Sequence, residues 1–262
     1  MANTVIYRQS MQSEAETNVP IGLITGTNLS AILGQHLRVI EVDTPFGAPS
    51  AAFVLTSISN RLIWCLARHG PSSQIKAFDV NYRANVWAFK ELGVQSLLAT
   101  ATVGGVNASV EIGDIVIPDQ IVDYTFGREH TFAKELEFAS IDFTFPFSGT
   151  LREALNQALP NESRSSEQPH WTYGCTQGPR LETAAEVNRM RKDGCDLVGM
   201  TLMPEAALAR EIGLNYAAIC LVVNKAAGVG GKTIDIEQIP VMTSSRIPVL
   251  RDYLERVLQL IE

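Results

Sequence analysis

The chain has 262 residues, of which 46% are hydrophobic and 19% are charged, and its formal net charge is −7. This composition is ordinary for a soluble α/β domain, and the length lies near the upper range for one hydrophobic core. No cluster of Lys and Arg stands out, which argues against nucleic acid as a partner, and no apolar run is long enough to span a membrane. We therefore expect one domain over residues 19–262, preceded by a flexible extension over residues 1–18.

The four cysteines are far apart and form no CxxC pair; they are Cys65, Cys175, Cys195 and Cys220. Because few histidines stand near them in the sequence, no metal site is predicted. Free, buried thiols in a reducing cytoplasm are the simplest interpretation. The polar N-terminus lacks the apolar segment of a signal peptide, which also favours the cytoplasm.

Branched apolar runs that end in Gly or polar residues predict strands, and apolar residues at helical spacing predict helices. In chain order we expect strands over Pro20–Ile24, Ala51–Ile58, Leu62–Ala67 and Ser96–Thr100, with a helix over Asn81–Leu92 before the last of these. Further strands are expected over Asp114–Val122, Trp171–Cys175, Asp196–Gly199 and Tyr216–Val223. Further helices are expected over Thr150–Leu159, Thr183–Asp193 and Ser244–Leu260, and another helix is expected to start at Thr201. This alternation predicts an α/β fold with a central, mixed, mainly parallel sheet flanked by helices.

Two stretches between these elements are unusual. Pro118 lies within a predicted strand, which indicates an edge position or a bulge. Residues 124–148 are rich in aromatic side chains but show little periodicity, and a stretch of that length indicates function or a subunit interface.

Asn224 directly follows a strand that is predicted to be buried on both faces. Ligands collect at the carboxyl ends of such strands in open α/β sheets. A side-chain amide donates and accepts at once, which suits a heterocycle that carries a carbonyl next to an N–H. The alternative is an Asn that only fixes the next turn.

Other strand ends carry groups suited to an anion. Residues Thr25–Asn28 follow the first strand and leave backbone N–H groups and the Thr27 hydroxyl exposed. Arg68-His69-Gly70 follows a second strand and suits a phosphate or carboxylate, although a surface Arg with a core His is the alternative. A glycine turn over residues 101–105 would allow close approach of backbone to a ligand. Thr201 adds a hydroxyl at a helix start.

In combination these motifs resemble the trimeric nucleoside phosphorylases, most closely the members that act on 5′-methylthio nucleosides. The matching motifs are Gly26-Thr27, Arg68–Gly70, Val80–Glu91, Gly113–Gln120, Gly178–Glu182, Gly199–Thr201, Met203–Ala206 and Val223-Asn224. The resemblance covers about residues 19–260. It implies phosphorolysis of an N-glycosidic bond, a homotrimer with sites at subunit borders, inorganic phosphate as co-substrate and no cofactor.

The resemblance also assigns roles to individual residues. It implies that five side chains grip the phosphate: Thr27, Arg68, His69, Thr102 and Thr201. Such donors must be in place before an anion attacks C1′ of the sugar. Met200 would lie under the ribose and Leu181 against the base.

Glu182 and Asn224 match relatives that cleave 6-oxopurine nucleosides. A carboxylate accepts from N1–H, and the Asn amide donates to O6 and accepts from N7–H as the base leaves; relatives specific for 6-aminopurines carry Asp in place of Asn224. Each buried mismatch costs on the order of 1–3 kcal/mol, so two mismatches select strongly between bases. The alternative for Glu182 is a solvated residue in a first helical turn.

The Ile-rich segment Thr233–Ile239, including Ile236, indicates an apolar pocket that favours a methylthio group over a hydroxyl. The expected substrate is therefore 5′-methylthioinosine, with 5′-methylthioadenosine or inosine and guanosine as alternatives. Departures from the family pattern leave a third alternative, a nucleoside-binding relative without catalysis. The positions that depart from the family pattern are Asn28, Ser73, Ala101, Thr102 and Leu202.

Overall fold

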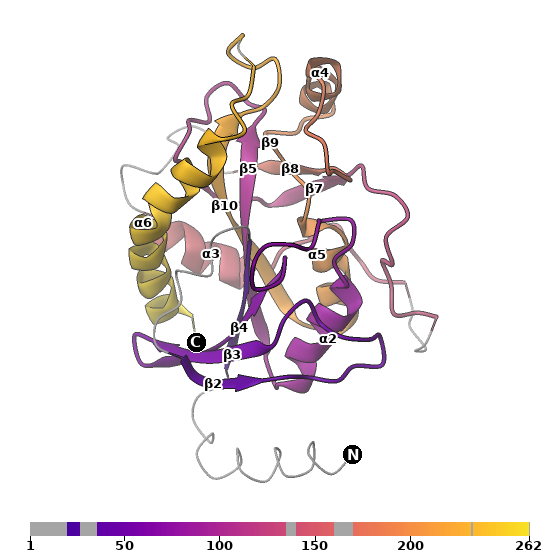
Figure 1. The fold of residues 1–262 in the computed structure, drawn as a ribbon, viewed down its shortest axis with the longest axis vertical. Coiled ribbons are helices and arrows are strands. Elements are labelled where there is room, and N and C mark those ends of the chain that lie inside the picture. The colour runs from indigo at the N-terminus through magenta and orange to yellow at the C-terminus, as the bar shows by residue number, and fades with distance from the viewer. Residues whose placement is uncertain (1–19, 27–35, 135–139, 160–169, 232, 262) are drawn as a thin grey trace.

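The computed structural model describes residues 20–26, 36–134, 140–159, 170–231 and 233–261, and the expected N-terminal extension lies outside them (Figure 1). Ten strands in this part of the chain form one sheet. Its centre consists of four neighbouring parallel strands, in the order β4 (Arg61–Ala67), β1 (Ile21–Thr25), β5 (Ser96–Gly105) and β10 (Asn215–Lys225). Their carboxyl ends therefore open at the same edge of the sheet.

Antiparallel strands extend this centre on both sides. β3 (Phe53–Ile58) and β2 (His36–Ile40) continue it beyond β4, and β6 (Ile115–Val116) pairs with β10. On the other side β9 (Leu197–Gly199) pairs antiparallel with the end of β5, and β8 (Thr172–Cys175) and β7 (Gln120–Asp123) follow it in parallel. Five of the nine pairings are parallel, which confirms the mixed, mainly parallel sheet.

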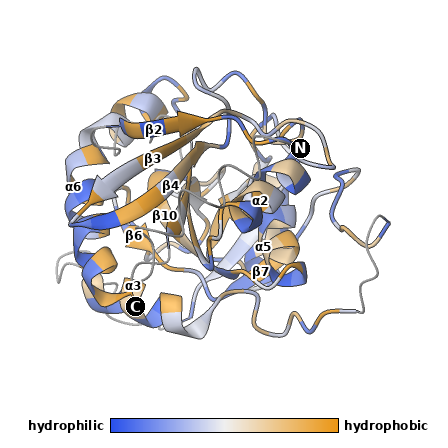
Figure 2. Cartoon of the chain, turned by 90° about the horizontal axis from the view of Figure 1, so that it is seen from below, coloured by the Kyte–Doolittle hydropathy of each residue, from blue (hydrophilic) through white to orange (hydrophobic). Residues whose placement is uncertain are grey.

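Helices cover both faces of the sheet (Figure 1). α2 (Tyr82–Glu91) and α5 (Leu202–Glu211) pack on one face, and α3 (Gly149–Ala158) and α6 (Gln238–Leu260) pack on the other. α4 (Ala184–Lys192) lies beyond β9 and closes a third, small core. Figure 2 shows the apolar colour concentrated on the central strands, with the hydrophilic colour on the outer faces of the helices.

Local sequence explains where several elements begin and end. The Asn81 side chain accepts from the backbone N–H of Ala84 at 3.1 Å and caps the start of α2. Gly93 follows that helix with a φ of 77°, a left-handed conformation that suits Gly. Ser59 and Asn60, at φ values of 50° and 62°, form the tight turn that joins β3 and β4, the two strands expected on either side of it.

Two predictions about strands were wrong, and one strand was missed. The expected turn at residues 101–105 is part of β5, because β10 pairs with it along this length and holds it extended. The expected strand over Asp114–Val122 is two short strands, β6 and β7, separated at residues 117–119, where Pro118 removes a donor. β2 was not predicted, because its apolar alternation is limited to Leu37 and Val39, and both of these side chains are exposed at the edge of the sheet.

The four cysteines are free and buried, as predicted. Helices in the described ranges are too short or too polar to cross a membrane. Within the same ranges no three His, Cys, Asp or Glu side chains gather closely enough to hold a metal ion.

Gly22 allows α2 to pack closely on β1, and its replacement by Ala tests this packing. A Cβ at position 22 would lie 2.7 Å from Leu97 Cδ1 and 2.8 Å from Phe89 Cδ1. We expect Gly22→Ala to lower the free energy of unfolding by about 1–3 kcal/mol, as overpacking of a core does. Urea denaturation measures this. Gly149→Ala is the control, because no atom lies within 4 Å of a Cβ there; equal losses in both variants would contradict the packing argument.

Candidate active site

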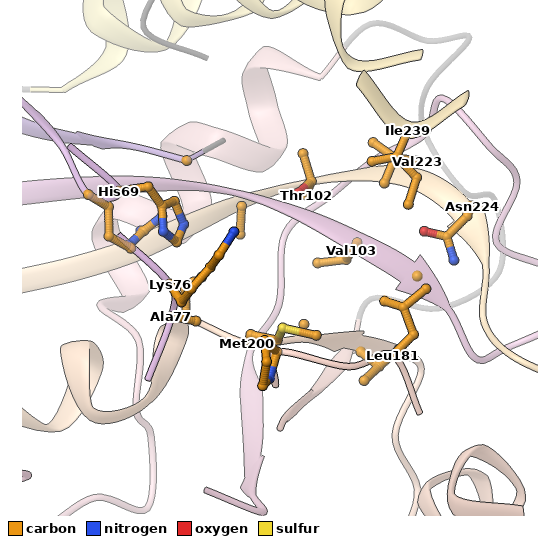
Figure 3. A pocket seen from close by; sticks show the side chains of 18 of the residues that line it. His69, Lys76, Ala77, Thr102, Val103, Leu181, Met200, Val223, Asn224 and Ile239 are labelled. Atoms are coloured by element: carbon orange, nitrogen blue, oxygen red, sulfur yellow. The ribbon is translucent and has the colours of Figure 1, made fainter. Parts of the chain in front are cut away.

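A cavity of about 270 Å³ opens at the carboxyl ends of the central strands (Figure 3). Each central strand or the turn after it contributes to the wall: Gly26 follows β1, Arg68 and His69 follow β4, residues 101–104 belong to β5, and Val223 and Asn224 belong to β10. Parallel strands bring residues from four distant parts of the chain to one place. This is the position at which α/β sheets bind ligands.

Most of the predicted site residues line this one cavity. They are Arg68, His69, Thr102, Leu181, Glu182, Met200, Thr201 and Asn224. Thr27 lies outside the described residues. Ile236 is 65% exposed and does not line the cavity; Ile234 and Ile239, from the same segment, do. The apolar segment thus reaches the cavity through the neighbours of Ile236, because α6 begins directly after it and leaves its side chain outside.

The side chains divide the cavity into two ends (Figure 3). His69 lies at one end, Asn224 and Leu181 lie at the other, and Thr102 and Met200 lie between them. This separation places the groups suited to an anion away from the groups suited to a purine.

Arg68 lies fully buried behind the first end. Its Nε and Nη2 donate to the two carboxylate oxygens of Glu205, both at 2.8 Å, and its Nη1 donates to the Thr100 carbonyl at 2.9 Å. Burial alone would lower the pKa of Arg68, but the adjacent Glu205 carboxylate outweighs burial and holds that pKa above its ordinary value. A guanidinium has five N–H groups, so two remain for a ligand.

Glu205 itself was not predicted as a site residue. Its side chain is fully buried and also accepts from the Tyr216 hydroxyl at 2.6 Å. An acid in the first turn of a helix is usually a solvated residue, so nothing local indicates that it pairs with Arg68, 137 positions away. The fold alone brings the two charges together.

His69 is held in one orientation and in its neutral form. Its Nδ1 lies 2.9 Å from the Ile75 carbonyl oxygen, which only accepts, so Nδ1 carries the proton and Nε2 keeps a lone pair. Burial, together with the charge of Arg68, lowers the pKa of His69 to about 4. The imidazole therefore adds no positive charge to the cavity at neutral pH.

This lowered pKa predicts a pH-dependent stability. Between pH 6.5 and about 4 the unfolded chain binds a proton on His69 that the folded chain does not bind. The free energy of unfolding therefore falls as pH decreases through this window, and the contribution is fully present above it. Urea denaturation of the wild type and His69→Gln across pH 4–7 measures the difference, which we expect to be smaller at pH 4.5 than at pH 7. A difference that does not change with pH would contradict the prediction.

Gly26 and Thr201 contribute to the end of the cavity where His69 lies. Gly26 allows the backbone to approach closely, and Thr201 adds a hydroxyl. The Gly26 N–H donates to Thr100 Oγ1 at 2.9 Å, and a Cβ at Gly26 would lie 2.9 Å from the Thr100 carbonyl oxygen. Thr201 stands at the start of α5, where its side chain makes no capping hydrogen bond. Its hydroxyl, like that of Thr102, is therefore placed to donate into the cavity.

The amide and carboxylate at the other end are each fixed by one hydrogen bond. Asn224 lies at an irregularity in the pairing of β10 with β5, and its Nδ2 donates to the Lys225 carbonyl at 2.8 Å. The amide oxygen of Asn224 faces the cavity (Figure 3). Glu182 Oε1 accepts from the Thr176 hydroxyl at 2.7 Å, which leaves Oε2 for a ligand. Thr176 was also missed: it directly follows β8, but a lone Thr there carries no sign that its hydroxyl orients Glu182, six positions further on.

Arg128 ties together the two loops that carry these residues. Its Nη1 donates to the carbonyls of Met200 and Met203, and its Nη2 donates to those of Thr176 and Gln177, both at 3.1 Å. Arg128 comes from the aromatic stretch for which function or an interface was expected. A single Arg in a loop carries no signal of this role, since four of its six hydrogen bonds are to backbone carbonyls, which any residue offers.

The fold and this two-ended cavity define an enzyme of the nucleoside phosphorylase class. The chain belongs to the phosphorylase superfamily, whose family model matches residues 20–259. It is 44% identical over 239 residues to a probable S-methyl-5′-thioinosine phosphorylase of Pseudomonas syringae pv. tomato, an alignment that covers 90% of this chain and 97% of the relative.

Two further comparisons agree with this assignment. The chain is 39% identical over 226 residues to a 6-oxopurine nucleoside phosphorylase of Pyrococcus furiosus, covering 84% of each chain. Its fold is similar to that of a solved structure of methylthioadenosine phosphorylase from Schistosoma mansoni in complex with adenine. That match has a TM-score of 0.84 and 30% identity, and covers 93% of this chain and 92% of the other.

Proposed function

We propose that the chain cleaves 5′-methylthioinosine with inorganic phosphate and releases hypoxanthine and 5-methylthioribose 1-phosphate. The observation that carries the proposal is that Glu182 and Asn224 line the same cavity as the groups suited to an anion. Asn224 lies at the end opposite His69, together with Leu181, which directly precedes Glu182 (Figure 3). A carboxylate beside an amide is complementary to the N1–H and O6 of a 6-oxopurine. The name of the Pseudomonas relative supports the same substrate.

The arrangement supports a reaction in which this chain's residues bind and orient. Phosphate would lie against Arg68, Thr102 and Thr201, with Thr27 as a further expected donor, and His69 Nε2 would accept from the protonated oxygen of hydrogen phosphate. One phosphate oxygen would attack C1′ of the sugar. As the C1′–N9 bond breaks, its electron pair passes to the purine, which takes a proton from solvent at N7, while the phosphate gives up its own proton as it becomes the sugar phosphate. The Asn224 amide oxygen would accept from that N7–H, and Glu182 would accept from N1–H. Groups already in place need no reorganisation as charge develops.

The 5′ group and the ribose would occupy the apolar part of the cavity. Met200 lies between its two ends, and Leu181, Ile234 and Ile239 add apolar surface. An apolar wall favours a methylthio group, since a hydroxyl buried there without a partner loses its hydrogen bonds to water. Ordinary 6-oxopurine nucleosides and 5′-methylthioadenosine are the competing substrates. The name of the Pyrococcus relative, a 6-oxopurine nucleoside phosphorylase, supports inosine or guanosine, and the name of the Schistosoma enzyme supports 5′-methylthioadenosine.

Four further expectations belong to this proposal. We infer a homotrimer, a cytoplasmic location, inorganic phosphate as a co-substrate and no cofactor. Sedimentation velocity of the purified protein tests the trimer.

The deciding experiment follows base release from the three nucleosides with and without phosphate. We expect phosphate-dependent release of hypoxanthine, and a kcat/KM for 5′-methylthioinosine about 10-fold or more above those of inosine and 5′-methylthioadenosine, because one mismatched group costs about 1–3 kcal/mol. Tight binding of the nucleosides in calorimetry without any phosphate-dependent product would overturn the proposal in favour of a non-catalytic binding protein.

A further inference from the structure

We propose that Lys76 supplies the uncompensated positive charge that binds the phosphate at the anion end of this cavity. The inference rests on the proposed function and adds a residue to it. No family resemblance assigned Lys76 a role, and no sequence motif singled it out.

The first argument is the charge balance of the cavity wall. Among the described residues, the cations that line the cavity are Arg68 and Lys76. The charge of Arg68 is offset by the Glu205 carboxylate, at 2.8 Å and with both side chains fully buried. His69 is neutral at pH 7. Glu182 adds a negative charge at the other end, so without Lys76 the described wall would carry net negative charge against a phosphate dianion.

The second argument is that hydrogen bonds hold the backbone around Lys76 in place. Ile75, which precedes it, makes two hydrogen bonds with His69: its N–H donates to the His69 carbonyl, and its carbonyl accepts from His69 Nδ1, both at 2.9 Å. The Lys76 carbonyl accepts from the Asp79 N–H at 2.9 Å, and the Ala77 carbonyl accepts from the Tyr82 hydroxyl at 2.9 Å. The backbone on both sides of Lys76 is thus tied to the anion end of the cavity.

The third argument is where the ammonium group lies. Figure 3 shows the Lys76 side chain extending into the cavity, beside the His69 ring and toward Thr102. No described residue pairs with its Nζ, although Arg68, behind it, has a carboxylate partner. A strongly hydrated ammonium on a flexible stem suits a solvent-derived anion that enters and leaves on each turnover.

The test compares Lys76→Gln with Lys76→Arg and with Lys192→Gln. Lys192 is exposed at the end of α4, so its replacement makes the same change in net charge away from the cavity. We expect Lys76→Gln to raise KM for phosphate about 10- to 100-fold with little change in KM for the nucleoside, since one charge-assisted hydrogen bond to the anion is lost. Lys76→Arg should restore most of the affinity, and Lys192→Gln should match the wild type.

Two measurements keep this proposal separate from the proposed function. Calorimetry with inorganic phosphate alone reports binding whether or not a nucleoside is cleaved, and we expect Lys76→Gln to weaken it by the same factor. The phosphate affinity of the wild type should also fall with added NaCl more steeply than that of Lys76→Gln. Unchanged phosphate binding in a folded Lys76→Gln protein overturns the role of Lys76, whereas an inactive wild type that still binds phosphate through Lys76 overturns only the reaction.

Discussion

Glu205→Gln will lower the free energy of unfolding by about 3–5 kcal/mol and abolish phosphate-dependent turnover, because it leaves the buried Arg68 guanidinium without a counter-charge. Glu205 accepts three hydrogen bonds, two from Arg68 and one from the Tyr216 hydroxyl. Both members of the ion pair are fully buried, so water cannot replace the lost partner. Urea denaturation measures the stability, and base release at saturating phosphate measures the activity.

A double variant separates the two effects. Arg68→Met with Glu205→Leu replaces the ion pair by apolar side chains, and we expect its stability to return to within about 2 kcal/mol of the wild type. Its activity should stay absent, since the remaining N–H groups of Arg68 are gone. Arg251→Gln is the matched surface control, because Arg251 pairs with Glu255 while both are roughly half exposed, and its loss should cost less than about 1 kcal/mol. A Glu205→Gln variant as stable as the Arg251→Gln variant would contradict the argument.

Asn224→Asp will shift the base preference of the enzyme toward 6-aminopurines. The Asn amide donates to O6, whereas a carboxylate accepts from a 6-amino group, so the change removes one favourable contact and creates another. Two differences of about 1–3 kcal/mol each predict that the ratio of kcat/KM for 5′-methylthioinosine to that for 5′-methylthioadenosine falls by about 100-fold or more. Asp at this position loses the donor to the Lys225 carbonyl, the one partner of Asn224 among the described residues. Asn224 lies half-buried in the cavity wall, so its replacement does not bury a charge in the core.

The control for this exchange is Asn188→Asp, the same chemical change on the exposed face of α4. Its substrate ratio should equal that of the wild type. Steady-state kinetics with both nucleosides, at one saturating phosphate concentration, gives the ratios. An unchanged ratio in an active Asn224→Asp protein would remove Asn224 from base recognition.

Much of the cavity could be predicted because its residues follow strands. Apolar runs identify parallel strands locally, and the carboxyl ends of such strands must meet at one edge of the sheet. Arg68 and Asn224 follow or end such runs, so their convergence did not require knowledge of the strand order. Ile236 shows the limit of this reasoning: its segment was identified correctly, but the start of α6 decides which isoleucines face the cavity.

Local sequence by itself determined the alternation of strands and helices, the cap of α2 at Asn81 and the tight turn at Ser59-Asn60, because these depend on residues a few positions apart. Tertiary structure alone decided the Arg68–Glu205 pair, the clamp formed by Arg128, the full length of β5 and the position of Lys76 against the cavity. The first three depend on partners dozens of positions away or on backbone atoms that any residue can offer. Local hydrogen bonds hold the backbone around Lys76, but its side chain extends toward Thr102 only once the sheet has folded. The sequence identifies the chemical groups that each side chain carries, but only the folded structure determines which partner neutralises or orients each group.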